Sequence, residues 1–348
     1  MIHFQSDYLE GADERVLQAV VETNRWQTPG YGEDASCARA RELICRMTDC
    51  PHAGVHFVVG GTQANLLVIA TALRPWEGVL CAESGHIAVH ETGAIEATGH
   101  KVLTVRCKDG KLAASQVEDA MQAHQADETH EHIVKPAMVY ISHPTEFGTL
   151  YTRAEVTALS ETCRKHGVLL FLDGARLGYG LAAGPEVDMP LLARCCDAFT
   201  IGGTKAGLLF GEAIVLTSDR LKDCFRYAMK QRGAMLAKGR LLGVQFEALL
   251  ADGYYTERCA CANAQAQRIK QAFLNKGFPL LCDTAANQVF PILPNAVIEE
   301  LRKKYGFAFW EKVDEENTAV RFCTSVTTQE ASVRSLEKDI AECGVRIV

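Results

Sequence analysis

Residues 197–213 read DAFTIGGTKAGLLFGEA, and this stretch places one cation, Lys205, directly after a strand-like apolar run. The run AFTIGG (198–203) is rich in apolar and β-branched residues, and EAIVLTS (212–218) is a second such run close behind it. Short apolar runs of this kind are typical of strands that are buried on both faces of a sheet. We therefore expect Lys205 to lie in a loop at the carboxyl end of a buried strand.

Earlier runs of the same character extend this pattern toward the N-terminus. Helical patterns such as 62–73 and 153–167 separate most of them, and the second ends on lysine, histidine and glycine, as helices often do. Alternation of strands and helices predicts an α/β fold with a mostly parallel seven-stranded sheet between helices. The earlier runs are VHFVVG (55–60), GVLCAE (78–83), KVLTVR (101–106), AMVYIS (137–142) and GVLLFLD (167–173).

The pattern changes after residue 220. One long helical region is expected over 220–250 and another over 257–276, followed by shorter elements that predict a smaller α/β domain. We divide the chain into an N-terminal segment (1–15) that packs near the site, a large domain (16–240) and a small C-terminal domain (241–348). The shorter elements are strands at 287–293, 307–313 and 319–325 and helices at 296–304 and 328–342.

Length and composition exclude several classes of function. The chain has 348 residues, of which 23% are charged and 48% hydrophobic, and its formal net charge is −7. This balance leaves no basic surplus for nucleic acid, and no apolar stretch approaches the length of a membrane span. The fourteen cysteines are scattered without the repeated CxxC spacing of a zinc site. We expect a cytoplasmic protein with reduced thiols that binds neither nucleic acid nor membrane.

Three features follow strands at one predicted edge of the sheet. Asp173 ends the run GVLLFLD, residues 60–62 (Gly-Gly-Thr) start a helix after VHFVV, and Lys205 follows AFTIGG. Each feature alone has an ordinary interpretation, because aspartate can cap a turn, Gly-Gly-Thr can begin a helix and a lysine can point into water. Together they fit pyridoxal phosphate, whose aldehyde needs an amine, whose ring nitrogen needs a carboxylate and whose phosphate needs an anion site.

The chain resembles the threonine aldolase and β-eliminating lyase family of pyridoxal-phosphate enzymes, within the aspartate-aminotransferase fold group. The resemblance covers nearly the whole chain, and its most specific motifs are FLDGAR (171–176), GGTKAG (202–207) and SGHI with the following HETG (84–93). It implies the pyridoxal-phosphate-dependent transferase fold, fold type I. It also implies a lyase that cleaves the Cα–Cβ bond of a β-hydroxy amino acid, such as L-threonine or L-allo-threonine, into glycine and an aldehyde.

The resemblance implies roles for the residues around the cofactor. Lys205 would form a Schiff base with it and Asp173 would pair with its ring nitrogen. Arg176 would lie close to the cofactor and would influence its orientation and charge. Gly61 and Thr62 (61–62) would bind the phosphate. His86 would stack on the cofactor ring and would also manage the proton of the substrate hydroxyl, directly or through a water.

The resemblance also implies roles on the substrate side. Arg321 would pair with the substrate α-carboxylate, a task that suits its forked donors, and Ser6 would help to hold the same group. Tyr31 would be contributed across a dimer interface, so a homodimer or homotetramer with shared active sites is expected. No metal is expected, because His86 and His90, which stand four residues apart, have no evident third ligand beyond the adjacent Glu91.

The sequence departs from the aldolase pattern on the substrate side. Residues 5–8 read QSDY where the family has Arg-Ser-Asp-Thr, and residues 141–146 read ISHPTE where it has an acidic residue followed by Asn-Thr-His. Two alternatives therefore stay open. One is a β-elimination that releases pyruvate and ammonia with the same cofactor, and the other is a catalytically silent protein of this fold. The sequence does not decide the physiological substrate, its threo or allo preference, or dimer against tetramer.

Overall fold

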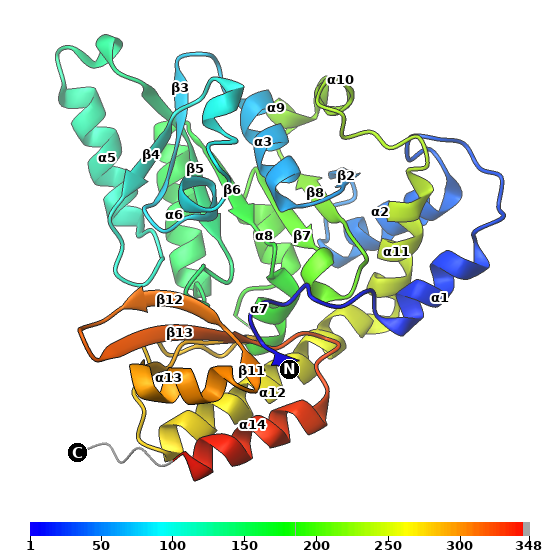
Figure 1. The fold of residues 1–348 in the computed structure, drawn as a ribbon. Coiled ribbons are helices and arrows are strands. Elements are labelled where there is room, and N and C mark those ends of the chain that lie inside the picture. The colour runs from blue at the N-terminus through cyan, green and yellow to red at the C-terminus, as the bar shows by residue number, and fades with distance from the viewer. Residues whose placement is uncertain (185, 344–348) are drawn as a thin grey trace.

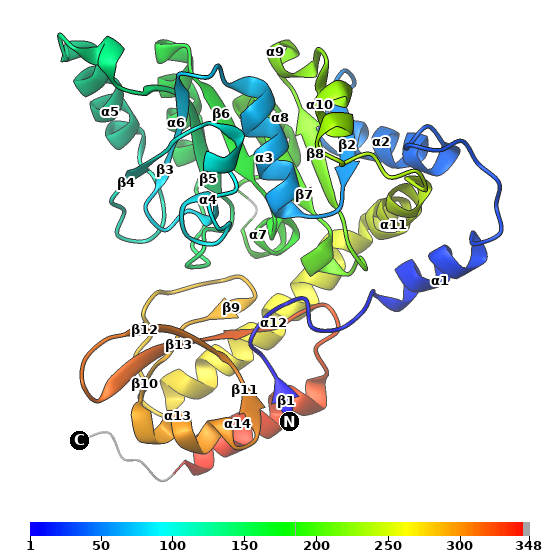
Figure 2. The same ribbon diagram turned by 45° about the horizontal axis from the view of Figure 1, so that its top comes forward.

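The computed structural model describes residues 1–184 and 186–343, so residues 344–348 of the predicted small domain lie outside it. A central seven-stranded sheet with helices on both faces forms the larger lobe, and a smaller lobe lies below it (Figures 1 and 2). Among the described residues, no helix has both the length and the apolar character needed to cross a bilayer.

The central sheet confirms the seven predicted strands. Its order is β2-β8-β7-β6-β5-β3-β4, and β8 runs antiparallel to both of its neighbours while the other pairings are parallel. The predicted mostly parallel sheet is therefore confirmed. The strands are β2 (Gly54–Val58), β3 (Glu77–Ala82), β4 (Val102–Val105), β5 (Lys135–Ser142), β6 (Leu169–Asp173), β7 (Ala198–Gly202) and β8 (Glu212–Leu216).

Each face of this sheet has its own hydrophobic core, because successive side chains of a strand point to opposite faces. In β6, Leu170 and Leu172 join one core, whereas Leu169 and Phe171 join the other. The first face is covered by α2 (Ala35–Met47), α5 (Ala114–Ala126), α6 (Arg153–His166), α8 (Met189–Cys195) and α11 (Arg240–Leu250). The second is covered by α3 (Gly61–Ala72), α4 (His86–Val89), α9 (Asp219–Lys222) and α10 (Phe225–Gln231).

Local sequence explains where α6 begins and ends. Thr152 accepts a hydrogen bond from the main-chain N–H of Glu155, and the Glu155 side chain accepts one from the N–H of Thr152, which forms a capping box. At the other end Gly167 takes the left-handed conformation, with φ of 66°. The helix predicted from its lysine, histidine and glycine ending is therefore confirmed.

Two predicted elements are wrong in their continuity. The helical region expected over 220–250 is divided into α9, α10 and α11, because Cys224 and Gly233 adopt left-handed φ values of 58° and 69°. The strand expected over 287–293 is divided into β9 (Gln288–Val289) and β10 (Ile292–Pro294). Pro291 lies between the two strands and has no N–H to donate to a continuous ladder.

The smaller lobe has a third hydrophobic core. Its sheet contains β9, β10, β12 (Ala308–Lys312) and β13 (Asn317–Cys323), and it packs with α13 (Asn295–Arg302) and α14 (Glu330–Glu342). α12 (Tyr254–Asn275) joins the lobes, since its residues up to Ala262 pack in the larger lobe and those from Ala266 in the smaller one (Figure 2). The predicted boundary at residue 240 stays a prediction, but we propose that the division lies within α12, because α11 packs on the larger lobe.

The N-terminal segment crosses from the smaller lobe to the larger one. It begins as β1 (Ile2–His3), which pairs in parallel with β11 (Tyr305–Gly306), and Phe4 is buried in the core of the smaller lobe. The chain then crosses to the larger lobe, where α1 (Glu14–Glu22) packs against α11 (Figures 1 and 2). This path places residues 5–8 beside the carboxyl ends of the central strands.

Candidate active site

A cavity lies at the carboxyl ends of β5, β6 and β7, where the sequence predicts a site. Asp173, Arg176, Lys205 and His86 all line it. Four predicted site residues from three separate motifs therefore face one space. The remaining lining residues are Ser142, Pro144, Thr145, Glu146 and Ala175.

Close contact between the loops after β6 and β7 brings these side chains together. A Cβ atom at Gly174 would lie 2.0 Å from the carbonyl oxygen of Thr200, and one at Gly202 would lie 2.2 Å from that of Ala175. With glycine at both positions the two loops approach closely enough to form hydrogen bonds. Gly174 N donates to Thr200 Oγ1 at 2.8 Å, and Gly202 N donates to Gly174 O at 2.9 Å. Glycine is therefore required at both positions for Asp173 and Lys205 to share a cavity.

Asp173 is held as a buried carboxylate. Its Oδ2 accepts hydrogen bonds from Tyr140 Oη at 2.6 Å and Asn65 Nδ2 at 2.9 Å, and its Oδ1 accepts one from Ala175 N at 2.8 Å. Burial alone would raise its pKa, but the charge of His86 and these hydrogen bonds outweigh burial and lower the pKa. An ionised carboxylate is the partner that a protonated ring nitrogen needs.

Lys205 lies in a 3₁₀ turn (Thr204–Ala206) directly after β7. The Tyr179 hydroxyl donates a hydrogen bond to its carbonyl oxygen at 2.6 Å, which fixes the turn. Burial lowers the pKa of the Lys205 ammonium, and the charge of Arg176 acts in the same direction, while nearby carboxylates oppose both. A lowered pKa increases the share of neutral amine, the form that attacks an aldehyde.

His86 begins the short helix α4 and is oriented by a buried acid. Its Nδ1 lies 2.8 Å from Glu91 Oε1, and Asn65 Nδ2 donates to the same oxygen at 2.7 Å. Asn65 thereby links the carboxylates of Glu91 and Asp173. With Nδ1 engaged, the Nε2 atom of His86 is left for the cavity. The ring of His90, the second histidine of the spacing considered for a metal, lies 5.6 Å from the His86 ring between centroids and is tilted by 57° relative to it.

Arg176 forms a bidentate ion pair with Asp7 of the N-terminal segment. Arg176 Nε donates to Asp7 Oδ2 at 2.7 Å and Nη2 donates to Oδ1 at 2.9 Å, and Asn287 Nδ2 adds a bond to Asp7 at 2.9 Å. Burial would raise the pKa of Asp7, but the Arg176 charge and these bonds lower it to about 2. This pair fastens residues 5–8 to the site.

The start of α3 has the features of an anion site. A Cβ atom at Gly60 or Gly61 would meet nothing within 4 Å, and no acidic residue lies in the first helical turn. The unpaired amides and the positive end of the helix dipole favour a phosphate there. Since Asn65, one turn further, contacts Asp173, this helix start lies beside the cavity. The residues at the site thus fit the predicted pyridoxal phosphate, although the roles of Gly61 and Thr62 stay predictions.

The predicted substrate residues lie outside the cavity lining. Arg321, in β13, donates from Nη2 to the Gln5 carbonyl at 3.1 Å, and its buried Nε has no hydrogen-bond partner among the residues that the structure describes. Ser6 is buried beside Asp7. Tyr31 is 45% exposed on the surface, under Lys230, whose Nζ lies 4.5 Å from the ring centroid. Their assigned roles stay predictions.

Several residues at the site were not predicted from the sequence. Asn65 lies within the quoted motif GGTQAN, and Asp7 lies beside Ser6, so motif reading could have included both. Glu146 ends the stretch ISHPTE (141–146) that departs from the family pattern, so it too could have been included, whereas Tyr140 carries no local signal. Tyr140 reaches Asp173 only because β5 and β6 are neighbours, and Glu146 reaches the main-chain N–H of His86 at 2.9 Å across 60 residues of chain.

Comparisons with known proteins agree with this geometry. The sequence profile of the β-eliminating lyase family matches residues 4–341. A low-specificity L-threonine aldolase from a Pseudomonas species is 33% identical over 343 residues, covering 97% of this chain and 96% of that protein. The structure of a Leishmania major threonine aldolase matches with a TM-score of 0.95 and 42% identity, covering 98% and 99% of the two chains. An aspartate aminotransferase variant from Thermus thermophilus, at 13% identity, a TM-score of 0.70 and coverage of 98% and 91%, shares the fold alone.

Proposed function

This chain belongs to the β-eliminating lyase family, and from that premise we propose that it cleaves the Cα–Cβ bond of a β-hydroxy amino acid of the threonine class. It is a pyridoxal-phosphate-dependent lyase with the fold-type-I architecture predicted from its sequence. The observation that carries the proposal is that Lys205, Asp173 and His86 line one cavity in a chain that matches threonine aldolases over nearly its full length. The products from threonine would be glycine and acetaldehyde.

Different residues around the cavity would hold different parts of the cofactor. Lys205 would hold its aldehyde carbon, Asp173 would keep its ring nitrogen protonated, and the helix start at Gly61 and Thr62 would bind its phosphate. Bound in this way, the cofactor supplies an electron sink for the pair released from the broken bond. Arg176 cannot serve as a mobile cation, because Asp7 already engages two of its nitrogens.

The substrate carboxylate decides which bond is broken, because its position sets the orientation of the groups around Cα. Arg321 is the candidate for this clamp. Its buried Nε, which has no partner within residues 1–184 and 186–343, supports the assignment, since a guanidinium nitrogen that is buried without an acceptor favours an incoming carboxylate. Trp310 lies against the same guanidinium, with Cζ 5.6 Å from its ring centroid, and restricts its motion.

Product analysis of the cofactor-loaded enzyme tests this function. Incubation with L-threonine and L-allo-threonine should yield glycine and acetaldehyde in equal amounts, and comparison of the two rates gives the stereochemical preference. Pyruvate from serine or cysteine, without glycine from threonine, would establish β-elimination instead. Lys205→Ala is the control, and it should lose both the cleavage activity and the visible absorbance band of the lysine-bound cofactor. No turnover of any amino acid by a cofactor-loaded protein would favour the catalytically silent alternative.

We also propose that the protein assembles as a homodimer or homotetramer. Large apolar side chains are exposed on α1, on the loop that follows it and on α10. These three segments lie along one edge of the larger lobe (Figure 1). Patches of this kind are typical of protein interfaces. The residues are Leu17, Val21, Trp26, Tyr31 and Tyr227, with exposed fractions of 45%, 61%, 53%, 45% and 81%. Sedimentation equilibrium should give a multiple of the 38.1 kDa chain mass, and a monomer at micromolar concentration would refute the assembly.

A cytoplasmic location remains the proposal made from the sequence. The fourteen cysteines are all free thiols, and the six that are buried all have raised pKa values because burial disfavours the thiolate. Free, unreactive thiols are compatible with a reducing compartment. Fractionation of the native cells, followed by immunodetection, would test this location.

A further inference from the structure

Glu146 is a carboxyl group in the cavity that the proposed function has not used. It lines the cavity together with Lys205, Asp173 and His86. Its Oε1 accepts hydrogen bonds from Ser142 Oγ at 2.7 Å and from the main-chain N–H of His86 at 2.9 Å. Both bonds engage the same oxygen, so Oε2 keeps its capacity to accept a proton.

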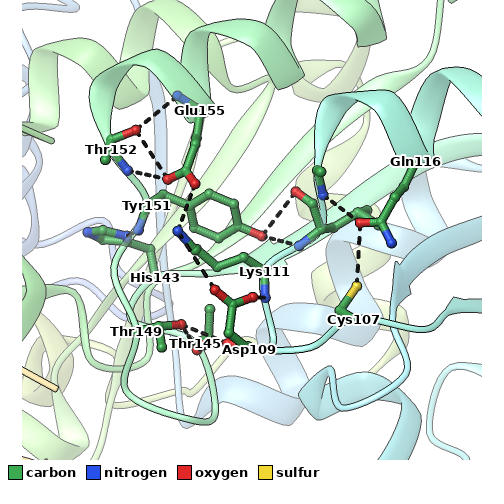
Figure 3. A network of polar contacts seen from close by, with 12 residues as sticks. Cys107, Asp109, Lys111, Gln116, His143, Thr145, Thr149, Tyr151, Thr152 and Glu155 are labelled. Atoms are coloured by element: carbon green, nitrogen blue, oxygen red, sulfur yellow. Dashed lines mark hydrogen bonds and ion pairs between the residues drawn. The ribbon is translucent and has the colours of Figure 1, made fainter. Parts of the chain in front are cut away.

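The turn that carries Glu146 is fixed on the side of the larger lobe. Thr145 and Thr149 close the turn, with a main-chain hydrogen bond from Thr145 N to Thr149 O at 3.0 Å and their hydroxyl oxygens 2.6 Å apart. The Thr149 hydroxyl then donates to the Asp109 carbonyl oxygen at 2.8 Å. Figure 3 shows these three residues together, with Lys111 beside them bridging to Glu155 at 2.7 Å.

The smaller lobe fixes the same turn from its other side. The carbonyl oxygen of Phe147 accepts a hydrogen bond from Cys282 Sγ at 3.1 Å. The Phe147 ring packs edge-on against Trp310 at a centroid distance of 5.4 Å, and Trp310 also contacts Arg321, the candidate carboxylate clamp. The backbone beside Glu146 is therefore tied to the residue expected to orient the substrate, as a group that reacts with that substrate requires.

The surroundings of Glu146 make its carboxylate more basic than a carboxylate in water. Burial is the largest cause and raises its pKa, and the nearby charge of Asp173 acts in the same direction. The hydrogen bonds from Ser142 and from the His86 main chain oppose them without reversing the direction. The other charged groups that face this space are Arg176 and Lys205.

We propose that Glu146 is the catalytic base that takes the proton of the substrate β-hydroxyl. This inference rests on the proposed function. The proton of the O–H bond passes to Glu146, the electron pair of that bond becomes the second bond of the aldehyde C=O, and the Cα–Cβ pair stays with Cα. A proton added to Cα completes glycine, so that protons balance, and Glu146 ends the cycle ionised once it releases the proton it took.

The assignment moves the hydroxyl proton from His86, where the sequence analysis placed it, to Glu146. Glu91 already engages Nδ1 of His86, and the side chain of His86 is 32% exposed, so its ring lies closer to water than the buried carboxyl does. His86 then serves to orient Glu146 through its main-chain N–H and to pack on the bound cofactor. The two assignments predict different behaviour for the variants Glu146→Gln and His86→Asn.

Glu146→Gln is the decisive variant, because the amide can keep the bonds from Ser142 and His86 through its oxygen but cannot take a proton. Two reactions of the cofactor-loaded enzyme are compared, namely cleavage of threonine and exchange of the glycine Cα proton in D₂O, which involves no hydroxyl. Cleavage should fall about 100-fold or more, within the range that a general base supplies. Exchange and the dissociation constant of the cofactor, measured by absorbance titration of the apoprotein, should change less than about threefold. Glu118→Gln, a change in a surface ion pair with Lys165, is the matched control and should leave both reactions unchanged.

Each other outcome overturns the assignment. Unchanged cleavage by Glu146→Gln would exclude Glu146 as the base while leaving the aldolase function intact. An equal loss of cleavage and exchange would show that Glu146 acts on the cofactor or on Cα. Retention of the acid limb of the pH–rate profile in Glu146→Gln, with its loss in His86→Asn, would return the role to His86. Exchange at Cα of glycine without any cleavage of threonine by the unmodified enzyme would refute the proposed function itself, and Glu146 would then have no hydroxyl to act on.

Discussion

Replacement of Asp7 by asparagine tests how the N-terminal segment is held on the site. Asp7 and Arg176 are both buried, and their paired side chains are 0% and 13% exposed. The change leaves the guanidinium without a counter-charge and turns an amide N–H₂ toward its donors. Loss of one partner of a buried pair costs about 3–5 kcal/mol, so Asp7→Asn should destabilise the protein by that amount at neutral pH.

The pH dependence gives a second estimate of the same interaction. The pKa of Asp7 lies at about 2 in the folded protein, against an ordinary value of 3.8. At about 1.36 kcal/mol per pKa unit, this difference corresponds to about 2 kcal/mol of stability. Because the folded-state pKa is the lower one, that stability is present above about pH 4 and is lost as the pH falls toward 2. The Asp7→Asn variant should lack this part of the acid destabilisation.

Urea unfolding of the cofactor-loaded enzyme, at one fixed protein concentration and at pH 7 and pH 3, measures both effects. Asp252→Asn is the matched control, because Asp252 also pairs with an arginine, Arg15 at 3.2 Å, but its side chain is 86% exposed. Asparagine also tolerates the left-handed φ of 58° at that position. The control should lose less than about 1 kcal/mol. If Asp7→Asn loses no more stability than the control at pH 7, the buried pair of Asp7 and Arg176 does not hold the N-terminal segment on the site.

Two further changes test the clamp and the loop contact. Arg321→Ala should raise KM for threonine by about 30-fold or more, the equivalent of about 2 kcal/mol for a lost charge partner, while the visible band of the bound cofactor stays unchanged; an unaltered KM would mean that another cation holds the carboxylate. Gly174→Ala should destabilise the protein by about 1–3 kcal/mol and weaken cofactor binding, because its Cβ would lie 2.0 Å from the Thr200 carbonyl oxygen. Gly11→Ala, whose Cβ would meet only Leu209 at 4.0 Å, is the control in urea unfolding, and equal losses in the two variants would contradict the steric argument.

The larger lobe could be predicted closely because its signals are local. Apolar runs fully buried in β6, β7 and β8 alternate with helices whose ends are marked by residues such as Thr152 and Gly167. The antiparallel direction of β8 was not predicted, since a connection of nine residues (203–211) between β7 and β8 has no periodic signal that specifies direction. The breaks in 220–250 and 287–293 were missed for a similar reason, because apolar periodicity continues across them.

For the site, the chemical groups could be identified from the order of residues along the chain. The strand-terminal Asp173, the loop Lys205 and the glycine start of α3 follow strands of one sheet, and the parallel direction of β2, β6 and β7 is enough to bring such residues to one edge. The protonation of these groups and their hydrogen-bond partners depend on contacts that form only when the chain folds. Asn65 lies 108 residues from Asp173 in the chain, Asp7 lies 169 from Arg176, and Glu146 lies 60 from His86. The physical reason is that burial and charge act through space, so a pKa or a hydrogen bond depends on neighbours that periodicity along the chain cannot identify.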